Sequence, residues 1–566
     1  MTGRLNVYTI SIFVALGGAL FGFDIASVAG VVGTHQYTTF YGNPLGTTQG
    51  SITGAMAAGS IVGALSSSFL GDKFSRKISI QIGAVFWCIG ATIQSASNGV
   101  AMLIAGRVIA GLCVGLTSAL VPIYQTEIAP RKLRGRIVGF QMFAITCGIM
   151  IQYFIQYGCS FINSEAAFRI PWAIQTIPAV ILFFSLFFLP YSPRWLASKD
   201  RWDEVLQVLA FLRTANENTN DPLVIAEYRE IEDQIRSERE ACSNSYRELF
   251  SQKIRKRLFI SMAVQMWSQL IGMNVMMYYI VYVLKSAGIA NARFASSIQY
   301  IINVVMTVPC LLWIDRWGRR PSLLIGALVM SFWHFLIGGL LMRYGEPNPV
   351  LNEPETWIVV GHSAVSRTIL ACSYLFVATF AVSWAPISWL YPPEIAPVRV
   401  RAKSVAVAAA TNWAANFALG FGVPPLLRSI SWRMFFVFGA FCIAAFIHVL
   451  LAVPETKQRT IEEMDEIFEH GEPLWKTFRA MGETDRLDKL ARDIELCAAA
   501  ASNLQAPHVF KHLKSSSTSN PEAPQVFNHL KSSSTSDSEA PQVFNHLKSS
   551  STSDSEAPQI LNHFKS

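Results

Sequence analysis

Residues 127–134 read Glu-Ile-Ala-Pro-Arg-Lys-Leu-Arg, and residues 394–401 read Glu-Ile-Ala-Pro-Val-Arg-Val-Arg. Each copy follows an apolar stretch that is long enough to cross a bilayer. Two further pairs of short motifs recur in the same order: DKFSRK at 72–77 with DRWGRR at 315–320, and PYSPR at 190–194 with PETK at 454–457. Because the members of each pair lie six apolar stretches apart, the sequence predicts a parallel duplication of a six-span unit.

The composition is that of a membrane protein. Of the 566 residues, 51% are hydrophobic and 15% are charged, whereas soluble domains carry roughly 25% charged residues. About twenty apolar residues cross a bilayer as a helix, and the sequence offers twelve such runs. We expect an all-α membrane protein of two six-helix bundles, with spans near 8–33, 51–70, 77–96, 100–123, 137–158, 170–190, 258–285, 294–314, 321–343, 368–391, 403–427 and 433–453.

Changes in composition divide the chain into five parts. The two bundles occupy 1–190 and 258–453, and the charged linker 191–257 between them has the spacing of short surface helices. A segment at 454–508 follows, and residues 509–566 form a 17-residue repeat that begins with VFKHLKS at Val509. The Ser-rich repeats are too polar to form a core and are predicted to be disordered. They could dock an unidentified partner, accept phosphate, or be inert.

Basic residues predict the orientation. Lys and Arg cluster in the loops after spans two, four, eight and ten, whereas 35–50 contains none, so both termini and the linker are expected in the cytoplasm. The net charge of +8 therefore reflects membrane topology and does not indicate nucleic-acid binding. The nine cysteines are scattered without a CxxC motif, and the chain has neither a phosphate-binding loop nor HExxH. No metal site, cofactor or enzymatic activity is predicted, and transport cannot use ATP hydrolysis by this chain.

Acidic and basic residues at the cytoplasmic span ends are candidates for a gate. Carboxylates and guanidinium groups at these places can form ion pairs that hold the halves together and break when the protein opens inward. The alternative is that the basic residues serve membrane topology alone. The candidates are Asp72, Arg76, Glu127, Arg134, Asp315, Arg319, Glu394 and Arg401.

Two ionisable residues lie inside predicted spans. Asp24 is in the first span and Arg107 is in the fourth. Charges are expensive within a bilayer and commonly serve a function there. A carboxylate that alternates between pairing with a guanidinium and binding a proton would suit a proton-coupled carrier. A structural ion pair is the alternative.

Amides and indoles concentrate in spans seven to eleven. Amides donate and accept hydrogen bonds together, as a polyhydroxylated ligand requires, and indole faces can pack against a sugar ring. Hydrogen bonding between helices would explain the same residues without a ligand. They are Gln265, Gln269, Asn274, Asn303, Trp384, Trp389, Asn412, Trp413 and Asn416.

Residues 8–468 resemble the sugar-porter branch of the major facilitator superfamily, especially fungal monosaccharide transporters. The resemblance implies alternating access, in which two six-helix bundles rock around one central sugar site. The motifs that carry it are GGALFGFD (17–24), GRVIAGLCVG (106–115), VPIYQTEIAPRKLRG (121–135), SPR (192–194), QMWSQLIGMNVMMYY (265–279), DRWGRR (315–320), WAPISWLYPPEIAP (384–397), NWAANF (412–417) and PETKQRTIEEMDEIF (454–468).

The resemblance also assigns roles. Asp24 and Arg107 match the proton-coupling pair of family symporters, although some fungal facilitators keep the aspartate. Trp413 and Asn416 match the NWxxN motif of span eleven. The positions that match sugar-binding residues of the family are Gln265, Gln269, Asn274, Asn303, Trp389 and Asn412.

Four positions depart from the family pattern. Met142 replaces the usual glutamine of span five, with Gln141 beside it as a substitute, and Ser268 replaces the first glutamine of the pair in span seven. Tyr191 replaces a glutamate and Ser75 a glycine in two cytoplasmic motifs, changes expected to weaken the inward gate. Because two amides of the family pattern are absent or displaced, a pentose or a broad monosaccharide range is open as the substrate beside a hexose.

The sequence therefore predicts a multi-pass carrier of the plasma membrane, whose partners are a monosaccharide, a proton and the lipid bilayer. Three alternatives stay open: a sugar sensor that signals through the long tail, a facilitator without proton coupling, and a carrier of a sugar acid, polyol or quinate.

Overall fold

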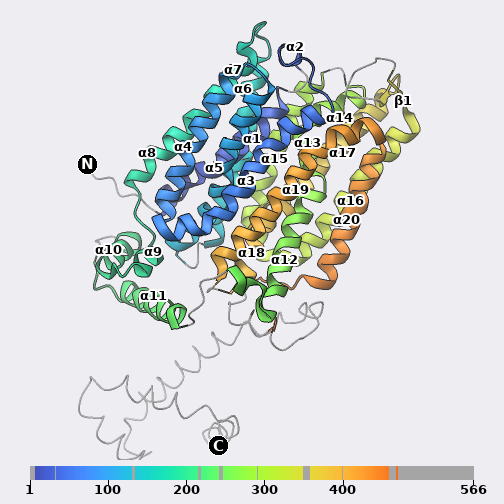
Figure 1. The fold of residues 1–566 in the computed structure, drawn as a ribbon. Helices are drawn as coiled ribbons and strands as arrows, with labels where there is room; N and C mark the ends of the chain where they lie inside the picture. Colours follow the sequence, from blue (N-terminus) through green and yellow to red (C-terminus); the bar gives the residue numbers. More distant parts are fainter. Residues whose placement is uncertain are drawn as a thin grey trace, which may run out of the picture. The chain divides into compact units, whose positions relative to one another are not determined.

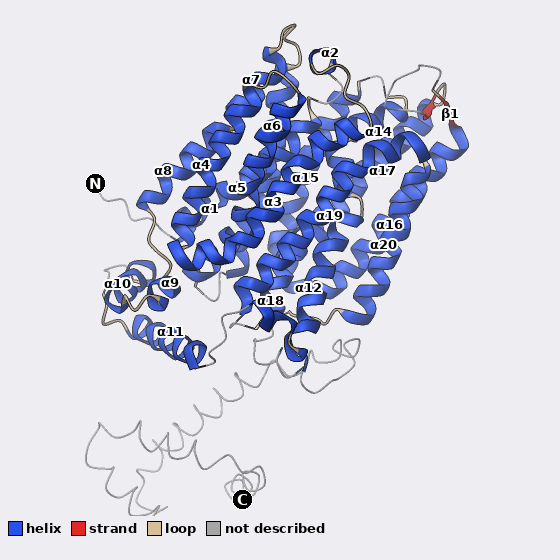
Figure 2. Ribbon diagram, viewed as in Figure 1, coloured by secondary structure: helices blue, strands red, loops and turns tan. Residues whose placement is uncertain are grey.

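The computed structural model describes residues 7–31, 34–130, 134–214, 218–240, 246–289, 291–348, 357–397, 400–457, 464, 467 and 468. All of them belong to the unit Met1–Ala480. The predicted repeats at 509–566 lie outside the described residues. Helices make up nearly all of the described chain (Figures 1 and 2).

The first half contains six spans. Its long helices are α1 (Val7–Ala29), α3 (Thr47–Phe74), α4 (Arg76–Ser95), α5 (Val100–Ile128) and α6 (Arg134–Cys159), and its sixth span is formed by α7 (Ala166–Ile174) with α8 (Thr176–Phe188). The short helix α2 (His35–Phe40) connects α1 to α3.

The second half begins with a span that is broken into α12 (Gln252–Leu270), α13 (Met273–Tyr278) and α14 (Ile280–Ser286). It continues with α15 (Ala292–Trp317), α16 (Arg319–Tyr344), the pair α17 (Ser363–Val382) and α18 (Trp384–Ile395), α19 (Arg401–Ile430) and α20 (Arg433–Ala452). Strands β1 (Gly345–Pro347) and β2 (Trp357–Val359) pair antiparallel between α16 and α17, with Gly345 opposite Val359.

The linker forms α9 (Pro193–Ser198), α10 (Trp202–Arg213), α11 (Pro222–Glu240) and the 3-10 helix η2 (Tyr246–Phe250). Helices α9 to α11 share a small apolar core around Leu196 and Leu209. They lie at one end of the bundle, below called the linker end, whereas α2 and β1 lie at the opposite end, called the hairpin end (Figure 1).

Eleven spans within the described residues are long and apolar enough to cross a membrane. The remaining predicted span, 403–427, lies within α19, a helix of 30 residues. Asn412 and Asn416 are buried in α19, and such polar residues lower its hydropathy. With α19 counted, the helices give the twelve spans that the sequence predicts.

Three spans predicted as continuous segments are broken. The span at 170–190 breaks at Gln175, 258–285 breaks at Gly272 and Tyr279, and 368–391 breaks at Ser383 and extends over 363–395. The last break has a clear cause, because Pro386 lacks the N–H that Val382 would bond in a continuous helix. Instead the Cys310 thiol donates to the Val382 carbonyl oxygen at 3.2 Å.

Glycines allow the closest helix approaches. A Cβ on Gly59 of α3 would collide with the Val108 carbonyl oxygen of α5, and one on Gly111 of α5 would collide with that of Met56. The same device joins the two halves, since a Cβ on Gly50 of α3 would collide with the Phe421 carbonyl oxygen of α19. Such small residues let membrane helices gain contacts without a hydrophobic driving force.

Candidate functional site

A buried ion pair joins α1 and α5. One Arg107 guanidinium nitrogen lies 3.0 Å from Asp24 Oδ2, and both side chains are at most 1% exposed. Arg107 also donates to the Ser27 hydroxyl at 3.2 Å, whereas Asp24 Oδ1 has no hydrogen-bond partner among the described residues. The carboxylate therefore keeps one oxygen available in the interior of the bundle.

The ion pair is connected to the second half of the molecule. The side chain of Tyr278 on α13 lies within electrostatic range of Asp24 and Arg107 and interacts with Asn416 of α19. Tyr278 itself is 2% exposed. A change of charge on Asp24 would thus change the electrostatic energy of Tyr278, which interacts with Asn416 of the second half.

Five amides of the second half form one cluster, below called the amide cluster: Gln265, Gln269, Asn274, Asn412 and Asn416. Asn412 lies at its centre, because its Nδ2 donates to Gln265 Oε1 at 2.7 Å and its Oδ1 accepts from Gln269 Nε2 at 3.1 Å. Asn274 and Asn416 both donate to Gln269 Oε1.

The amide cluster is neutral and carries donors and acceptors in similar number. Its members are at most 9% exposed. Since each amide bonds another amide, a ligand that offers hydroxyl groups can take over those bonds one by one. The cluster is therefore suited to an uncharged ligand with many hydroxyl groups.

The other predicted site residues lie in different surroundings. The Trp413 indole N–H donates to the Ser118 hydroxyl of α5 at 3.2 Å, and its ring meets Phe21 of α1 edge-on, so it bridges the two halves. Trp384 instead donates to the Leu323 carbonyl oxygen of α16 at 3.0 Å, a contact between helices of one half. Gln141 is buried against Gly18 of α1. Asn303 is buried in α15 and Trp389 is half-buried in α18.

Sequence reasoning missed several polar partners. Ser268 was interpreted only as a lost amide, yet its hydroxyl accepts from Asn412 at 3.2 Å. Its spacing of three residues from Gln265 places both on one helix face, which was the available signal. The serines that accept from Arg107 and Trp413, Ser27 and Ser118, belong to no motif and gave no such signal.

At the linker end, the described ion pairs join helices of the same half. Arg76 of α4 lies 3.1 Å from Asp72 and 3.2 Å from Glu127. Arg319 of α16 lies 2.8 Å from Glu394 of α18. The side chains of Arg134 and Asp315 lie outside the described residues, and Arg401 is half-buried at the start of α19. A bond between the halves through these residues stays a prediction.

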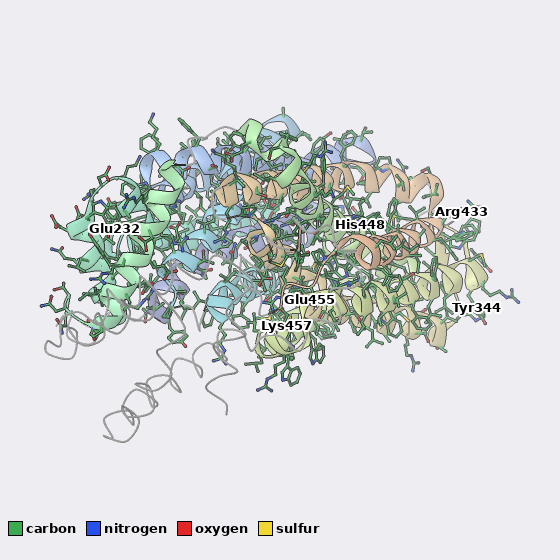
Figure 3. All side chains as sticks on the ribbon, turned by 90° about the horizontal axis from the view of Figure 1, so that it is seen from below. Glu232, Tyr344, Arg433, His448, Glu455 and Lys457 are labelled. Carbon is green, nitrogen blue, oxygen red and sulfur yellow. The ribbon has the colours of Figure 1, made fainter. Side chains whose placement is uncertain are left out.

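The motif PETK (454–457) of the second half and the motif PYSPR (190–194) of the first half make different contacts at the linker end. In the second half, the Glu455 carboxylate accepts from the backbone N–H groups of Arg319 at 2.9 Å and Arg320 at 3.0 Å, and so caps α16. Lys457 donates to the Arg316 carbonyl oxygen at 2.6 Å. Figure 3 shows this end of the molecule with Glu455 and Lys457 labelled.

In the first half, Tyr191 holds the corresponding place. Its ring stacks on Trp195 at 5.4 Å, and the ammonium of Lys77 lies 4.9 Å from its centroid. Ser75 adopts a left-handed φ of 90°, and its hydroxyl accepts from the Ile78 N–H. The two departures from the family pattern are thus accompanied by contacts of another kind, a cation–π interaction and a serine cap.

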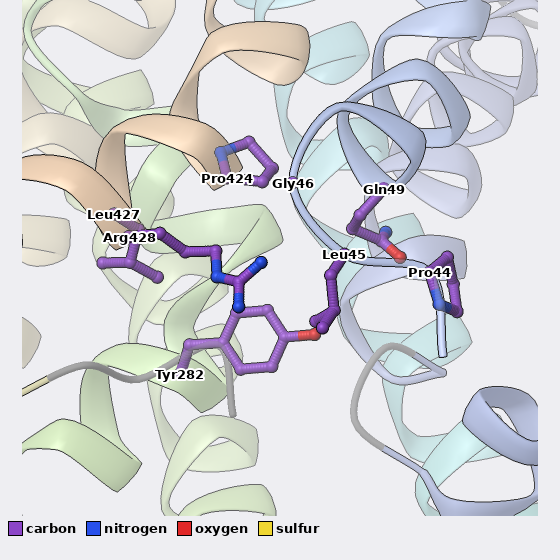
Figure 4. Close-up of a pocket in the computed structure, with 8 residues that line it drawn as sticks. All are labelled: Pro44, Leu45, Gly46, Gln49, Tyr282, Pro424, Leu427 and Arg428. Carbon is purple, nitrogen blue, oxygen red and sulfur yellow. The ribbon is translucent and has the colours of Figure 1, made fainter. Parts of the chain in front are cut away.

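A small pocket lies between the halves toward the hairpin end. It is lined by Pro44, Leu45, Gly46, Gln49, Tyr282, Pro424, Leu427 and Arg428 (Figure 4). The side chain of Gln49 is held in position by a hydrogen bond, because its Oε1 accepts from the Tyr37 hydroxyl at 3.1 Å. Burial raises the pKa of Tyr37 well above its usual value, so this phenol stays protonated and donates.

Comparison with known proteins gives the family. The family model described as "Sugar (and other) transporter" matches residues 10–468. The chain is 49% identical over 519 residues to the protein named "MFS glucose transporter mfs1" of Aspergillus flavus, a match that covers 89% of this chain and 98% of that protein. It is 32% identical over 483 residues to the "High glucose sensor RGT2" of Saccharomyces cerevisiae, covering 82% of this chain and 61% of the sensor.

A solved structure shares the fold. It is described as the proton:xylose symporter XylE bound to 6-bromo-6-deoxy-D-glucose, and it matches this chain with a TM-score of 0.68 and 26% identity. The match covers 82% of this chain and 99% of that one. The predicted fold class, with its two six-helix bundles, is thereby confirmed.

Substitution of Tyr191 tests the cation–π contact at the linker end. Tyr191→Ala removes the ring beside Lys77, and we expect the melting temperature of the detergent-solubilised protein to fall by about 1–3 °C, since such contacts contribute about 0.5–2 kcal/mol. Tyr191→Phe keeps the ring and serves as the matched control, with an unchanged melting temperature. Equal losses in both variants would assign the stabilisation to the hydroxyl instead.

Proposed function

Because the chain belongs to the sugar (and other) transporter family, we propose that it moves a monosaccharide, a hexose or a pentose, across the plasma membrane together with a proton. The observation that carries the proposal is the presence of a neutral amide cluster and a buried ion pair of Asp24 and Arg107 in one bundle, with Tyr278 interacting with Asn416 of the cluster and lying within electrostatic range of the ion pair.

The amide cluster supports a sugar as the ligand. A sugar presents hydroxyl groups that donate and accept, and it carries no charge that would need a cationic partner. All five amides are buried, so their hydrogen bonds are not weakened by bulk water. The names of the relatives point the same way, since one is called a glucose transporter and another a proton:xylose symporter.

The ion pair supports proton coupling. Two opposite charges at the centre of a bundle are stable when paired, and loss of one charge leaves the other costly. When a proton enters from outside and binds Asp24, the bond to Arg107 weakens and the helices α1 and α5 are free to shift. Release of that proton inside restores the pair and returns the carrier to its starting state.

Alternating access suits the contacts between the halves. The hairpin end is closed by α3 against α19 at Gly50, and by the Tyr153 hydroxyl, which donates to the Arg293 carbonyl oxygen at 2.9 Å. Basic residues concentrate at the linker end, which we therefore place in the cytoplasm with both termini. Transport requires these hairpin-end contacts to open while the linker end is closed, and to close while the linker end is open.

A sugar sensor is the second candidate, because the relatives include a protein named as a glucose sensor and the chain carries a tail beyond residue 500. Deletion of residues 501–566 separates the two functions. A carrier keeps its sugar uptake after the deletion. A sensor shows little uptake even with the full chain, and the deletion abolishes its glucose-dependent signalling.

The experiment that tests the proposal is uptake of labelled glucose and xylose by cells that lack their own sugar carriers. We expect the concentration of at least one sugar inside the cells to rise above its concentration outside, and a protonophore should abolish this accumulation. Uptake that only equilibrates would make the protein a facilitator. Absence of uptake, with the protein present at the cell surface, would contradict the carrier function.

Substitution of Asp24 tests the coupling step. Asp24→Asn removes the titrating oxygen but keeps the shape of the side chain, and we expect accumulation against a gradient to be lost while exchange of sugar at equal concentrations continues. Glu165→Gln is the control, since it removes a carboxylate 3.0 Å from Arg169 in an exposed ion pair. Normal accumulation by the Asp24 variant would refute the coupling role.

Substitution of Gln269 tests the sugar site. Gln269→Ala removes one hydrogen-bond partner from the ligand hydroxyls and from each of Asn274, Asn412 and Asn416, at a cost of about 1–3 kcal/mol. We expect the KM for the preferred sugar to rise about tenfold or more. Gln152→Ala is the control, because Gln152 is equally buried but donates to the Pro171 carbonyl oxygen in the first half. An unchanged KM would remove Gln269 from the site.

A further inference from the structure

The span that carries most of the amide cluster is broken at its middle. Helix α12 ends at Leu270, and Gly272 adopts a left-handed φ of 93° before α13 begins. In a continuous helix the Ile271 carbonyl oxygen would accept from the Val275 N–H. Here that N–H donates to the Gly272 carbonyl oxygen at 3.1 Å, so the helix itself leaves the Ile271 carbonyl without its usual donor. A carbonyl in this position needs a donor from elsewhere in the protein.

His334 supplies the nearer donor from α16, and the Cys442 thiol of α20 is a second, weaker donor to the same oxygen at 3.8 Å. Its Nε2 lies 2.9 Å from the Ile271 carbonyl oxygen, and its side chain is 1% exposed. A carbonyl oxygen only accepts, so Nε2 must carry the hydrogen. Nδ1 is buried without a hydrogen-bond partner in the described residues, which fits a neutral imidazole with a single N–H.

The imidazole also fills the space beside the break. A Cβ on Gly272 would lie 3.2 Å from His334 Nε2 and 2.9 Å from the Phe438 ring. The centroid of the Phe376 ring lies 4.4 Å from that of the imidazole. His334 is therefore held in place by α17 and α20 while it bonds the break between α12 and α13.

The break positions groups on both of its sides. Gln269 precedes it and Asn274 follows it, and the two side chains are hydrogen-bonded to each other. Tyr278, which lies near Asp24 and Arg107, is at the end of α13. The direction in which α13 leaves Gly272 therefore sets the geometry of the amide cluster and its link to the ion pair.

We propose that His334 is a positioning residue for transport, whose Nε2–H bond to the Ile271 carbonyl holds α13 against the first half and so keeps the hairpin end closed. The proposal rests on the proposed function, because it assigns a step of the transport cycle to this bond. The proposal gives a role in transport to His334 of α16, a residue that contacts neither the amide cluster nor the ion pair.

Three variants distinguish the effect of the hydrogen-bond donor from the effect of side-chain volume. His334→Gln keeps an N–H near the position of Nε2, His334→Leu removes it, and His334→Asn is polar but too short to reach Ile271. Ser331→Ala is the matched control, because Ser331 lies one turn away on α16 and its hydroxyl donates to the Gly439 carbonyl oxygen at 3.0 Å.

Two measurements are made on each variant at equal amounts of surface protein. The first is the maximal rate of labelled sugar uptake. The second is the rate at which a membrane-impermeant maleimide reacts with Leu427→Cys, since Leu427 is 8% exposed and lines the pocket between the halves. The same variants without that cysteine correct for the native thiols.

We expect His334→Leu and His334→Asn to lower the maximal rate about tenfold and to speed the labelling about threefold or more, because α13 leaves its closed position more often. His334→Gln and Ser331→Ala should match the parent in both measurements. Should the leucine variant fail to reach the surface, the asparagine variant decides the question.

Equal behaviour of the glutamine and asparagine variants would overturn the proposal, as would unchanged labelling in the variants that lack the donor. The labelling does not depend on sugar transport. If the parent protein moves no sugar, the proposed function fails, while the labelling rates still show whether this bond keeps the hairpin end closed.

Discussion

Within a bilayer every backbone polar group must find its partner inside the protein, and charged side chains are stable there mainly when paired; these constraints explain most of the polar contacts in the spans. Asp24 and Arg107 are tolerable in the interior because they neutralise each other, and Ser27 takes up a further guanidinium N–H. The broken helices obey the same rule. The Val382 carbonyl is bonded by Cys310, and the Ile271 carbonyl is bonded by His334. A helix can therefore break at membrane depth only where a neighbouring helix supplies the missing donor, and the position of a break is set by its neighbours as much as by its own residues.

The duplicated halves have diverged into different tasks. The first half holds the paired charges on α1 and α5, and the second half holds the amide cluster on α12, α13 and α19. Contacts such as those of Trp413 with Phe21 and Ser118 cross between them. Under the proposed function, charge and ligand are bound by different halves, so a change at one can bias the packing of the other only through the surface they share. The side chain of Tyr278 interacts with Asn416 of the amide cluster and lies within electrostatic range of the ion pair.

The sequence could predict what depends on one segment at a time. Apolar runs predicted the spans, and the motif pairs predicted the duplication. The residues of the amide cluster were also found, because amides are rare in apolar helices. Contacts between distant segments were not predictable in this way. His334 belongs to no motif, and its role depends on a backbone break 63 residues away. Tyr191 was interpreted as the loss of a carboxylate, since nothing in its own neighbourhood announces the approach of Lys77. The hydrogen bond from the Trp384 N–H to the Leu323 carbonyl oxygen joins segments 61 residues apart, and neither segment indicates it.

Under the proposed function, selectivity for the sugar follows from the way the amides bond one another. Asn412 bonds Gln265, Gln269 and Ser268, and Gln269 also accepts from Asn274 and Asn416. A ligand that enters must replace these bonds, so the free energy of binding is the difference between two sets of hydrogen bonds of similar strength. Small errors in the placement of a hydroxyl then decide whether that difference is favourable. The short side chain of Ser268 accepts from Asn412 beside this cluster and leaves more room there than an amide side chain would. The choice between a hexose and a pentose should accordingly depend on the shape of the space next to Ser268 and Asn412 more than on the number of polar groups.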